Sequence, residues 1–179
     1  MSEAERTKPE FLCPKRWFPA KDWKRTKKQK IFSLVTSNGK VFATKIELPW
    51  TAERFSTMVR TELGPWLRRT FRSRTSFQIL LDNEKVMKAP PALAALADNN
   101  IKVLPGWPAH SPELNPQENV WPWAEARVRE LEKSSDTFEQ FGTKVLAAVR
   151  AYPSATKLIT SMAKRMQDCI DNKGAAIMK

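Results

Sequence analysis

An alternation of apolar and polar positions gives the clearest predicted element of this chain, a β-hairpin in its first third. Residues 31–36 and 41–48 are rich in β-branched and aromatic side chains, as strands are, and residues 37–40 separate them. The separating segment contains Asn38-Gly39, which suits the two positive-φ positions of a type I′ turn. The pattern therefore predicts two antiparallel strands joined by a tight turn.

Two shorter apolar runs, residues 77–81 and 101–104, have the length and the flanking turn residues of buried strands. The first run ends directly at Asp82. The second leads through a Pro-rich turn to a helix whose start is marked by residues 115–116, so that Glu118 falls in the first helical turn. Because ligands of open α/β sheets bind at the carboxyl ends of strands, the two carboxylates are expected to form a site.

The helical spacing of apolar residues predicts the remaining elements. Thr51 is a suitable N-cap for a helix that is expected to end near Gly64-Pro65. A helix from the 115–116 start to about residue 132 contains Pro122, which is expected to kink it. Further helices are expected at residues 90–96, with Leu93 and Leu96 inward, at 137–150, and at 154–171, where Leu158, Ile159, Met162, Met166 and Ile170 form a stripe expected to pack in the core.

Residues 1–30 show no sustained period and are expected to be extended or irregular. This N-terminal arm interleaves cations with aromatic rings, which can stack on unpaired bases or lie along a nucleic-acid backbone. A basic arm that is disordered or only loosely docked explains the same composition, and both interpretations stay open. The nucleic-acid-binding candidates are Lys15, Arg16, Lys24, Arg25, Lys27 and Lys28 in the arm, and Lys85 and Lys88 shortly after Asp82.

The whole chain is strongly basic, and this favours a polyanionic partner. It carries 31 Lys and Arg residues against 19 Asp and Glu residues, a net charge of +12. Neutralising phosphates releases condensed counterions, which supplies affinity without reading sequence. Nucleic acid is therefore the expected partner.

With 179 residues the chain is expected to form one ordinary domain that needs no disulfide or metal to hold it together. Cys13 and Cys169 lie near opposite ends without metal-ligand spacing, which indicates reduced thiols of an intracellular protein. No signal peptide is recognisable, and no apolar run approaches the roughly 18 residues of a membrane span. We expect a soluble protein in the nucleus or another DNA-containing intracellular compartment, and not a secreted or membrane protein.

A distinctive order of residues surrounds the two carboxylates. Asp82 opens an Asp-Asn pair, and Glu118-Asn119 follows the turn SPELNP and precedes Val120-Trp121. Thirty-five residues lie between Asp82 and Glu118. This arrangement resembles the catalytic core of the mariner-type DDE transposases, in which the second and third catalytic acids stand in such motifs at a similar spacing. The match is long from residue 108 to residue 121 and thinner after Asp82, where residues 84–87 replace the Ala-Pro and His common in the family.

The resemblance implies an RNase H-like α/β fold, with a mixed sheet flanked by helices. It implies an enzyme that cuts and rejoins DNA with divalent cations, Mg²⁺ or Mn²⁺, which take hard oxygen ligands. The resemblance also implies that Asp82 and Glu118 are catalytic residues and metal ligands. Asp82 would bridge two ions, and Glu118 would hold one. A homodimer is implied as well.

The family's first central strand, which carries the first catalytic Asp, has no counterpart before residue 31, since Asp22 lies in PAKDWKR without strand character. The expected fold is therefore an RNase H-like mixed sheet missing its first central strand, as in a truncated copy. Two carboxylates leave a two-ion site incomplete, and partial sites turn over almost nothing. The expected parts are an arm of residues 1–30, a DDE transposase-like core of residues 31–152, and a C-terminal helix and tail of residues 153–179.

Simpler structural roles for both carboxylates stay open. Asp82 at a strand end can cap a local amide, and Glu118 stands three residues after Asn115, as in a capping box. Three functions are compatible with the sequence: a catalytically incomplete DDE nuclease domain, a non-catalytic nucleic-acid-binding protein derived from one, and a basic structural subunit of a larger assembly. Binding to DNA that weakens with salt separates the second function from the third.

Overall fold

The computed structural model describes residues 15–19, 28–82, 84–107, 111–131, 133 and 136–174, with the backbone alone for residues 15–19 and 28. In chain order the elements are β1 Lys15–Pro19, β2 Lys28–Val35, β3 Val41–Lys45, α1 Ala52–Met58, a π-helical turn Val59–Leu63, α2 Gly64–Thr70, β4 Phe77–Ile79, α3 Lys85–Lys88, α4 Pro90–Asp98, β5 Ile101–Val103, a 3-10 turn Pro112–Leu114, α5 Gln117–Leu131, α6 Phe138–Arg150, α7 Ala155–Thr160 and α8 Met162–Asp171. No helix in these described ranges is long and apolar enough to cross a membrane.

The predicted hairpin is confirmed as β2 and β3, but its turn differs from the expected type I′. Only Gly39 in this turn has a positive φ, +76°, whereas a type I′ turn needs two such residues. The N–H of Gly39 donates to the carbonyl of Thr36 at 2.9 Å, and the hydroxyl of Thr36 donates to the side chain of Asn38 at 2.6 Å. These two bonds of Thr36 fix the positions of Asn38 and Gly39. The hairpin therefore closes through a loop that is longer than a two-residue type I′ turn and has one left-handed glycine.

β1 pairs antiparallel with the first half of β2, so part of the expected N-terminal arm belongs to the sheet. The register places Lys15 opposite Phe32 and Pro19 opposite Lys28. The order of this sheet is β1-β2-β3. The sequence of β1, KRWFP, has no apolar alternation, which is why the strand could not be predicted.

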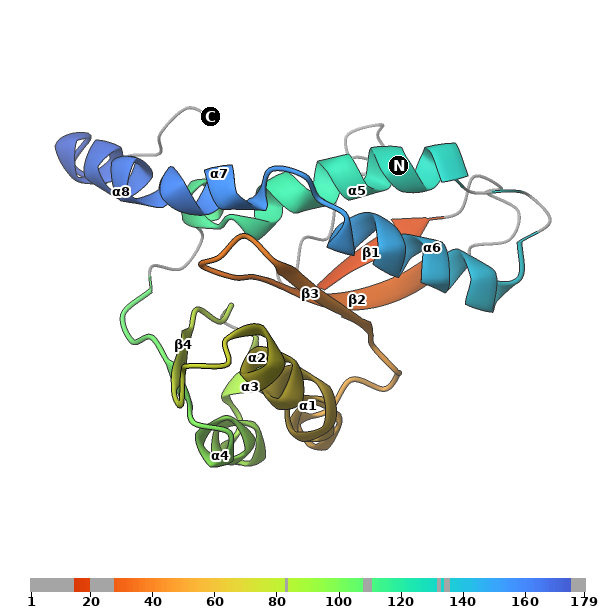
Figure 1. Ribbon diagram of the computed structural model, residues 1–179, viewed down its shortest axis with the longest axis horizontal. Helices are drawn as coiled ribbons and strands as arrows, with labels where there is room; N and C mark the ends of the chain where they lie inside the picture. Colours follow the sequence, from red (N-terminus) through yellow and green to blue (C-terminus); the bar gives the residue numbers. More distant parts are fainter. Residues whose placement is uncertain are drawn as a thin grey trace, which may run out of the picture.

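Helices cover both faces of this sheet (Figure 1). Successive side chains of a strand point to opposite faces. Phe32 and Phe42 therefore enter a core shared with α1, α2, α4 and the strands β4 and β5, whereas Ile31 and Val41 enter a second core shared with α5 and α6. The hairpin is the layer common to both cores, as expected for a sheet flanked by helices.

The sequence predicted that the helix after Thr51 ends near Gly64-Pro65, but the helical structure continues past these two residues. Thr51 is its N-cap, with Oγ1 accepting the N–H of Arg54 at 3.3 Å. The chain passes through the π-helical turn, in which the N–H of Gly64 donates to the carbonyl of Val59, and continues as α2. Pro65 falls in the first turn of α2, where a missing N–H is tolerated, so the wider turn carries the helix past the proline.

β4 and β5 confirm the two predicted buried strands and form a separate parallel pair, with Phe77 opposite Ile101. α4 connects them, and its buried positions are Ala92, Ala95 and Leu96. Leu93, which was predicted to face inward, is 42% exposed. It follows Ala92 by about 100° around the helix, which turns it out of the buried stripe.

The single C-terminal helix predicted at residues 154–171 is divided at Ser161 into α7 and α8. The hydroxyl of Ser161 donates to the carbonyl of Leu158 at 2.8 Å, where α7 ends. Leu158 is buried, but Met166 is 42% and Ile170 68% exposed. The prediction that the whole stripe packs in the core is therefore wrong, because the helix breaks at Ser161 and α8 lies on the surface.

Candidate active site

Asp82 lies where the sequence predicted it, just beyond the carboxyl end of β4. The N–H of Leu104 donates to the carbonyl of Ile79 at 2.9 Å, which extends the ladder beyond β5. Ile79 and Leu81 are buried, and Asp82 itself is half-buried. Packing of the strand therefore fixes the position of this carboxylate.

Asn115 holds the start of α5. Its Oδ1 accepts the N–H of Gln117 at 3.0 Å, and its carbonyl accepts the N–H of Glu118 at 3.2 Å. Asn115 thus caps the helix, as predicted, although its side chain binds the amide of Gln117 and not that of Glu118. Glu118 is half-buried in the first turn.

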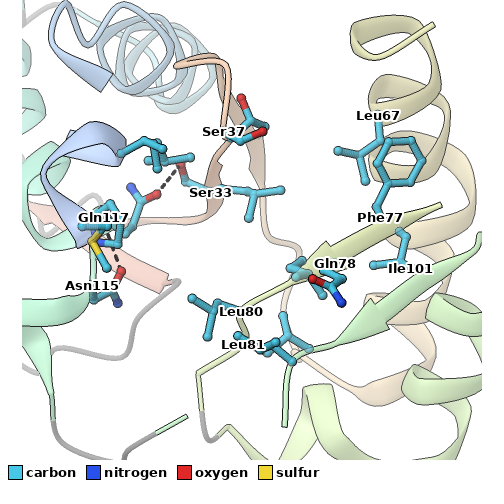
Figure 2. Close-up of a pocket in the computed structure, with 18 of the residues that line it drawn as sticks. Ser33, Ser37, Leu67, Phe77, Gln78, Leu80, Leu81, Ile101, Asn115 and Gln117 are labelled. Atoms are coloured by element: carbon cyan, nitrogen blue, oxygen red, sulfur yellow. Dashed lines mark hydrogen bonds between the residues drawn. The ribbon is translucent and has the colours of Figure 1, made fainter. Parts of the chain in front are cut away.

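A cavity of about 410 Å³ joins these two segments. Residues 77–82, which are β4 and the segment after it, line one part of the cavity, and residues 115–117, which lead into α5, line another. Figure 2 shows Ser33, Asn115 and Gln117 on one side of the space and Phe77 and Ile101 on the other. Cavities of this volume are typical of ligand sites.

Glu118 follows Gln117 directly, in a helix that Pro122 does not end. Pro122 has no N–H and cannot donate to the carbonyl of Glu118, four residues earlier, but the helix continues to Leu131. The structure therefore brings Asp82 and the residues before Glu118 to one cavity. Contact between the two carboxyl groups stays a prediction.

A two-ion centre needs more acidic ligands than Asp82 and Glu118 alone supply. Two-ion phosphoryl transfer requires carboxylates that hold both cations. Among the residues that the structure describes, no group of three Asp, Glu, His or Cys side chains could hold a metal ion. Asp82 and Glu118 are suitable oxygen ligands for Mg²⁺ or Mn²⁺, and a cation shared by the two carboxylates stays a prediction.

The predicted nucleic-acid-binding residues fall into separate places. Lys85 and Lys88 are exposed on α3, directly after the Asp82 segment. This puts two cations near the predicted catalytic carboxylate in the chain. Of the others, Lys15 and Arg16 lie in β1 and Lys28 begins β2, with side chains outside the description, and Lys24, Arg25 and Lys27 lie outside the described residues altogether.

Gln117 is a cavity residue that sequence reasoning missed. It is 5% exposed, and its Oε1 lies 3.3 Å from the hydroxyl of Ser33, 84 residues earlier. Its Nε2 is buried and has no hydrogen-bond partner among the described residues. No local pattern signals such a residue, because its burial depends on the packing of β2 against α5.

Arg74 also lines the cavity and was not among the site candidates. Its guanidinium lies 5.7 Å from the centroid of the Phe71 ring, within the range of a cation–π contact. The basic and aromatic stretch around it is visible in the sequence. Its position at the cavity required the structure.

The mixed α/β architecture, with helices on both faces of the β1-β2-β3 sheet, is that of an RNase H-like domain. The sequence from residue 15 to residue 141 matches the family model of the DDE superfamily endonucleases, and the chain belongs to that family. No curated protein matches the chain significantly.

Solved structures of Mos1 mariner transposase resemble the fold. The Mos1 catalytic domain with raltegravir and Mn has a TM-score of 0.71 at 18% identity, over 92% of this chain and 82% of that chain. A further structure of that domain has a TM-score of 0.66 at 18% identity, over 92% of this chain and 81% of that chain. The Mos1 paired-end complex with the left transposon end has a TM-score of 0.69 at 19% identity, over 99% of this chain and 51% of that one. The predicted RNase H-like α/β fold is confirmed, whereas the absence of its first central strand stays a prediction. The chain spans about half of the Mos1 chain in the paired-end complex.

Proposed function

We propose that this chain is a transposase-derived DDE domain that binds DNA beside the carboxyl end of β4 and is catalytically incomplete as this chain. The observation that carries the proposal is the cavity shared by Asp82 and the residues that lead into Glu118. By the resemblance to mariner-type transposases, these two residues are the second and third catalytic acids. Membership of the DDE family supports the same assignment.

In this proposal Asp82 and Glu118 together hold one divalent cation, Mg²⁺ or Mn²⁺. The Mos1 catalytic domain has been solved with Mn and with Mg, which supports the choice of metal. A bound cation would attract a phosphate oxygen of DNA to the cavity. In this proposal the family's first catalytic acid is missing, and loss of one member of a catalytic set removes nearly all turnover. In support, no group of three Asp, Glu, His or Cys side chains among the described residues could hold a metal ion.

Cations next to the cavity supply the contacts to phosphates. Lys85 and Lys88 follow Asp82 on α3, and Arg72 and Arg74 are exposed after α2. The net charge of +12 adds a long-range attraction to a polyanion. A DNA-containing compartment such as the nucleus and a homodimeric state belong to the same proposal, and both rest on the resemblance.

Two measurements on one DNA duplex test this function. In fluorescence anisotropy the affinity should fall steeply between about 50 and about 200 mM salt, because phosphate contacts release counterions. In a cleavage assay with Mg²⁺ or Mn²⁺ the chain should leave the duplex intact. Cleavage that needs the metal and is lost in Asp82→Ala contradicts catalytic incompleteness. Affinity that does not change with salt contradicts phosphate binding and favours the assembly subunit.

A further inference from the structure

The loop that follows α2 carries positive charge that no acidic residue of the same segment balances. Between residues 63 and 81 the sequence has four arginines and no Asp or Glu, and two of these arginines, Arg72 and Arg74, lie in the loop. No ion pair of the described residues includes either of them. The loop connects α2 to β4, the strand that leads to Asp82 (Figure 1).

The loop is held at both ends and exposed between them. The rings of Phe71 and Phe77 pack with their centroids 6.1 Å apart, and the N–H of Arg74 donates to the carbonyl of Phe71 at 2.9 Å. Every residue from 72 to 76 is exposed. The aromatic pair therefore closes the loop, and the sequence RSRTS between the two rings is open to a partner.

Three hydroxyl residues stand among these arginines, and Thr75 has the arrangement that an arginine-directed protein kinase recognises. Arg72 precedes Thr75 by three residues, and Arg74 precedes it by one. Kinases of this class select substrates by charge, because acidic residues of their clefts bind arginines on the amino-terminal side of the hydroxyl. An enzyme cleft can enclose an exposed loop without opening the core.

We propose that Thr75 is a phosphorylation site for an arginine-directed protein kinase, and that the phosphate cancels the positive charge of the loop. In the transfer, the hydroxyl oxygen of Thr75 bonds to the γ-phosphorus of Mg²⁺-bound ATP, and the bond from that phosphorus to ADP breaks. The proton of the hydroxyl passes to the catalytic carboxylate of the kinase. The product carries a charge of about −1.5 to −2 at pH 7, which offsets Arg72 and Arg74.

The same sequence pattern occurs at Thr57, but the fold blocks that position. Arg54 precedes Thr57 by three residues, and Thr57 is also exposed. Thr57 lies inside α1, however, between Phe55 and Met58, which are 0 and 6% exposed. A cleft can enclose Thr57 only if α1 leaves the core, which costs free energy that the loop at Thr75 does not require. The structure therefore selects one of two equivalent motifs.

The phosphate would act on the cavity described above. Arg74 lines this cavity together with Asp82, and its guanidinium lies beside the ring of Phe71. Phosphate oxygens form charge-assisted hydrogen bonds with guanidinium groups, so a phosphate on Thr75 would compete with DNA for Arg72 and Arg74. This effect on DNA rests on the proposed function, whereas the modification itself does not.

Incubation of the folded full chain with an arginine-directed kinase and Mg²⁺-ATP tests the site, and mass spectrometry locates the modified residue. Thr75 should take up a phosphoryl group, and Thr57 should take up at least about tenfold less, since α1 must open first. Arg72→Ala should slow the uptake at Thr75 by about tenfold or more, because it removes a charged contact to the kinase.

Arg54→Ala, the matched change at the second motif, should leave the uptake at Thr75 unchanged. Circular dichroism shows whether each variant is folded. Absence of uptake at Thr75 overturns the proposal, and so does equal uptake at Thr57 and Thr75.

Fluorescence anisotropy with one DNA duplex tests the consequence of the phosphate. At about 100 mM salt the modified chain should bind at least about tenfold more weakly than the unmodified chain, because each lost phosphate contact lowers the slope of log affinity against log salt by about 0.9. Thr75→Val, treated with kinase and ATP in the same way, should bind as the unmodified parent does. Equal affinity of the modified and unmodified parent overturns the effect of the phosphate. A chain that is modified at Thr75 but binds DNA in neither form supports the modification site and overturns the proposed function.

Discussion

The hydroxyl of Ser33 on β2 lies 3.3 Å from Oε1 of Gln117 at the start of α5, and both side chains are buried. The same hydroxyl donates to the carbonyl of Phe42 across the hairpin at 2.9 Å. This cluster connects the sheet to the helix that carries Glu118. The position of the proposed catalytic acid therefore depends on a polar contact inside the core.

Replacing Ser33 by Ala should destabilise the protein, because it removes the buried hydroxyl that donates to the carbonyl of Phe42 and lies against the buried amide of Gln117. Such a loss costs about 1–3 kcal/mol, and the free energy of unfolding in urea should fall by that amount. Gln117→Leu should cost less, since it removes the whole amide and leaves no buried polar group on that side chain. Ser37→Ala, at an exposed position of the adjacent turn, should stay within about 0.5 kcal/mol of the parent. Equal losses for Ser33→Ala and Ser37→Ala contradict the role of the contact.

Replacing Gly64 by Ala should destabilise the junction between the π-helical turn and α2, although Ala is normally the better helix residue. A Cβ on Gly64 would lie 2.2 Å from Oδ1 of Asn99. That amide is held on both sides, since it accepts from Arg68 at 3.1 Å and donates to the carbonyl of Ala95 at 2.9 Å. Overpacking of this kind costs about 1–3 kcal/mol.

Thermal unfolding of the Gly64→Ala variant is the measurement, and Asn99→Ala is the matched background. In that background the 2.2 Å contact is gone and only the carbonyl oxygen of Val59, at 3.1 Å, remains close, so most of the penalty for Gly64→Ala should vanish. A penalty that is the same in both backgrounds would show that the contact with Asn99 is not its cause.

Asp136 gives the stability of the fold an acid dependence. Its carboxylate accepts the N–H of Lys133 at 2.8 Å and a proton of Lys144 Nζ at 2.7 Å. The hydrogen bond from Lys133, followed by that from Lys144, lowers the pKa of Asp136 below its ordinary value of about 3.9. Because the folded pKa is below the unfolded one, the stabilisation is present above about pH 4 and is lost as the pH falls through the folded pKa.

Asp136→Asn should therefore flatten the decline of Tm with acidification below about pH 4. Lys144→Met should have part of the same effect, because the bond from the amide of Lys133 remains. Circular dichroism melts at a series of acidic pH values measure both. An Asp136→Asn variant whose Tm declines as steeply as that of the parent is the contrary result.

The double variant Lys85→Ala/Lys88→Ala should bind a DNA duplex more weakly and with a smaller dependence on salt. Each lost phosphate contact lowers the slope of log affinity against log salt by about 0.9, so two contacts lower it by about 1.8. Arg129→Ala/Lys133→Ala removes the same charge, with Arg129 in the last turn of α5, roughly 16 Å along the helix from Glu118, and Lys133 just beyond the helix end, and should change the slope less. Equal changes in the two double variants would mean that only the net charge matters.

Elements with a local signal were predicted from the sequence. The alternation in β2 and β3 is visible because each face of the hairpin enters a different core. The helix predicted from residue 137 begins there because Thr137 is the N-cap of α6. Thr137 and Gln140 form a capping box with hydrogen bonds of 3.2 and 2.8 Å. Asp82 was placed correctly for the same reason, as it ends a short apolar strand.

Features that depend on distant contacts were not predictable. Gly64-Pro65 is a stop signal in isolation, but the π-helical turn before it carries the helix past the proline. The stripe of α8 has the period of a core helix, but α8 has no buried residue. β1 lacks any pattern of its own and is defined by its pairing with β2. Gln117 became a cavity residue only when β2 and α5 came together.

The most direct test of whether Asp82 and Glu118 share one cation is the affinity of the full chain for Mn²⁺. Electron paramagnetic resonance measures this affinity, because the signal of free Mn²⁺ is lost on binding. Asp82→Asn and Glu118→Gln should each weaken binding by about tenfold or more, since even partners outside the ligand shell contribute 10- to 100-fold. Asp98→Asn and Glu130→Gln, at exposed carboxylates away from the cavity, should bind as the parent does. Parent-like Mn²⁺ affinity in either Asp82→Asn or Glu118→Gln would contradict a shared cation.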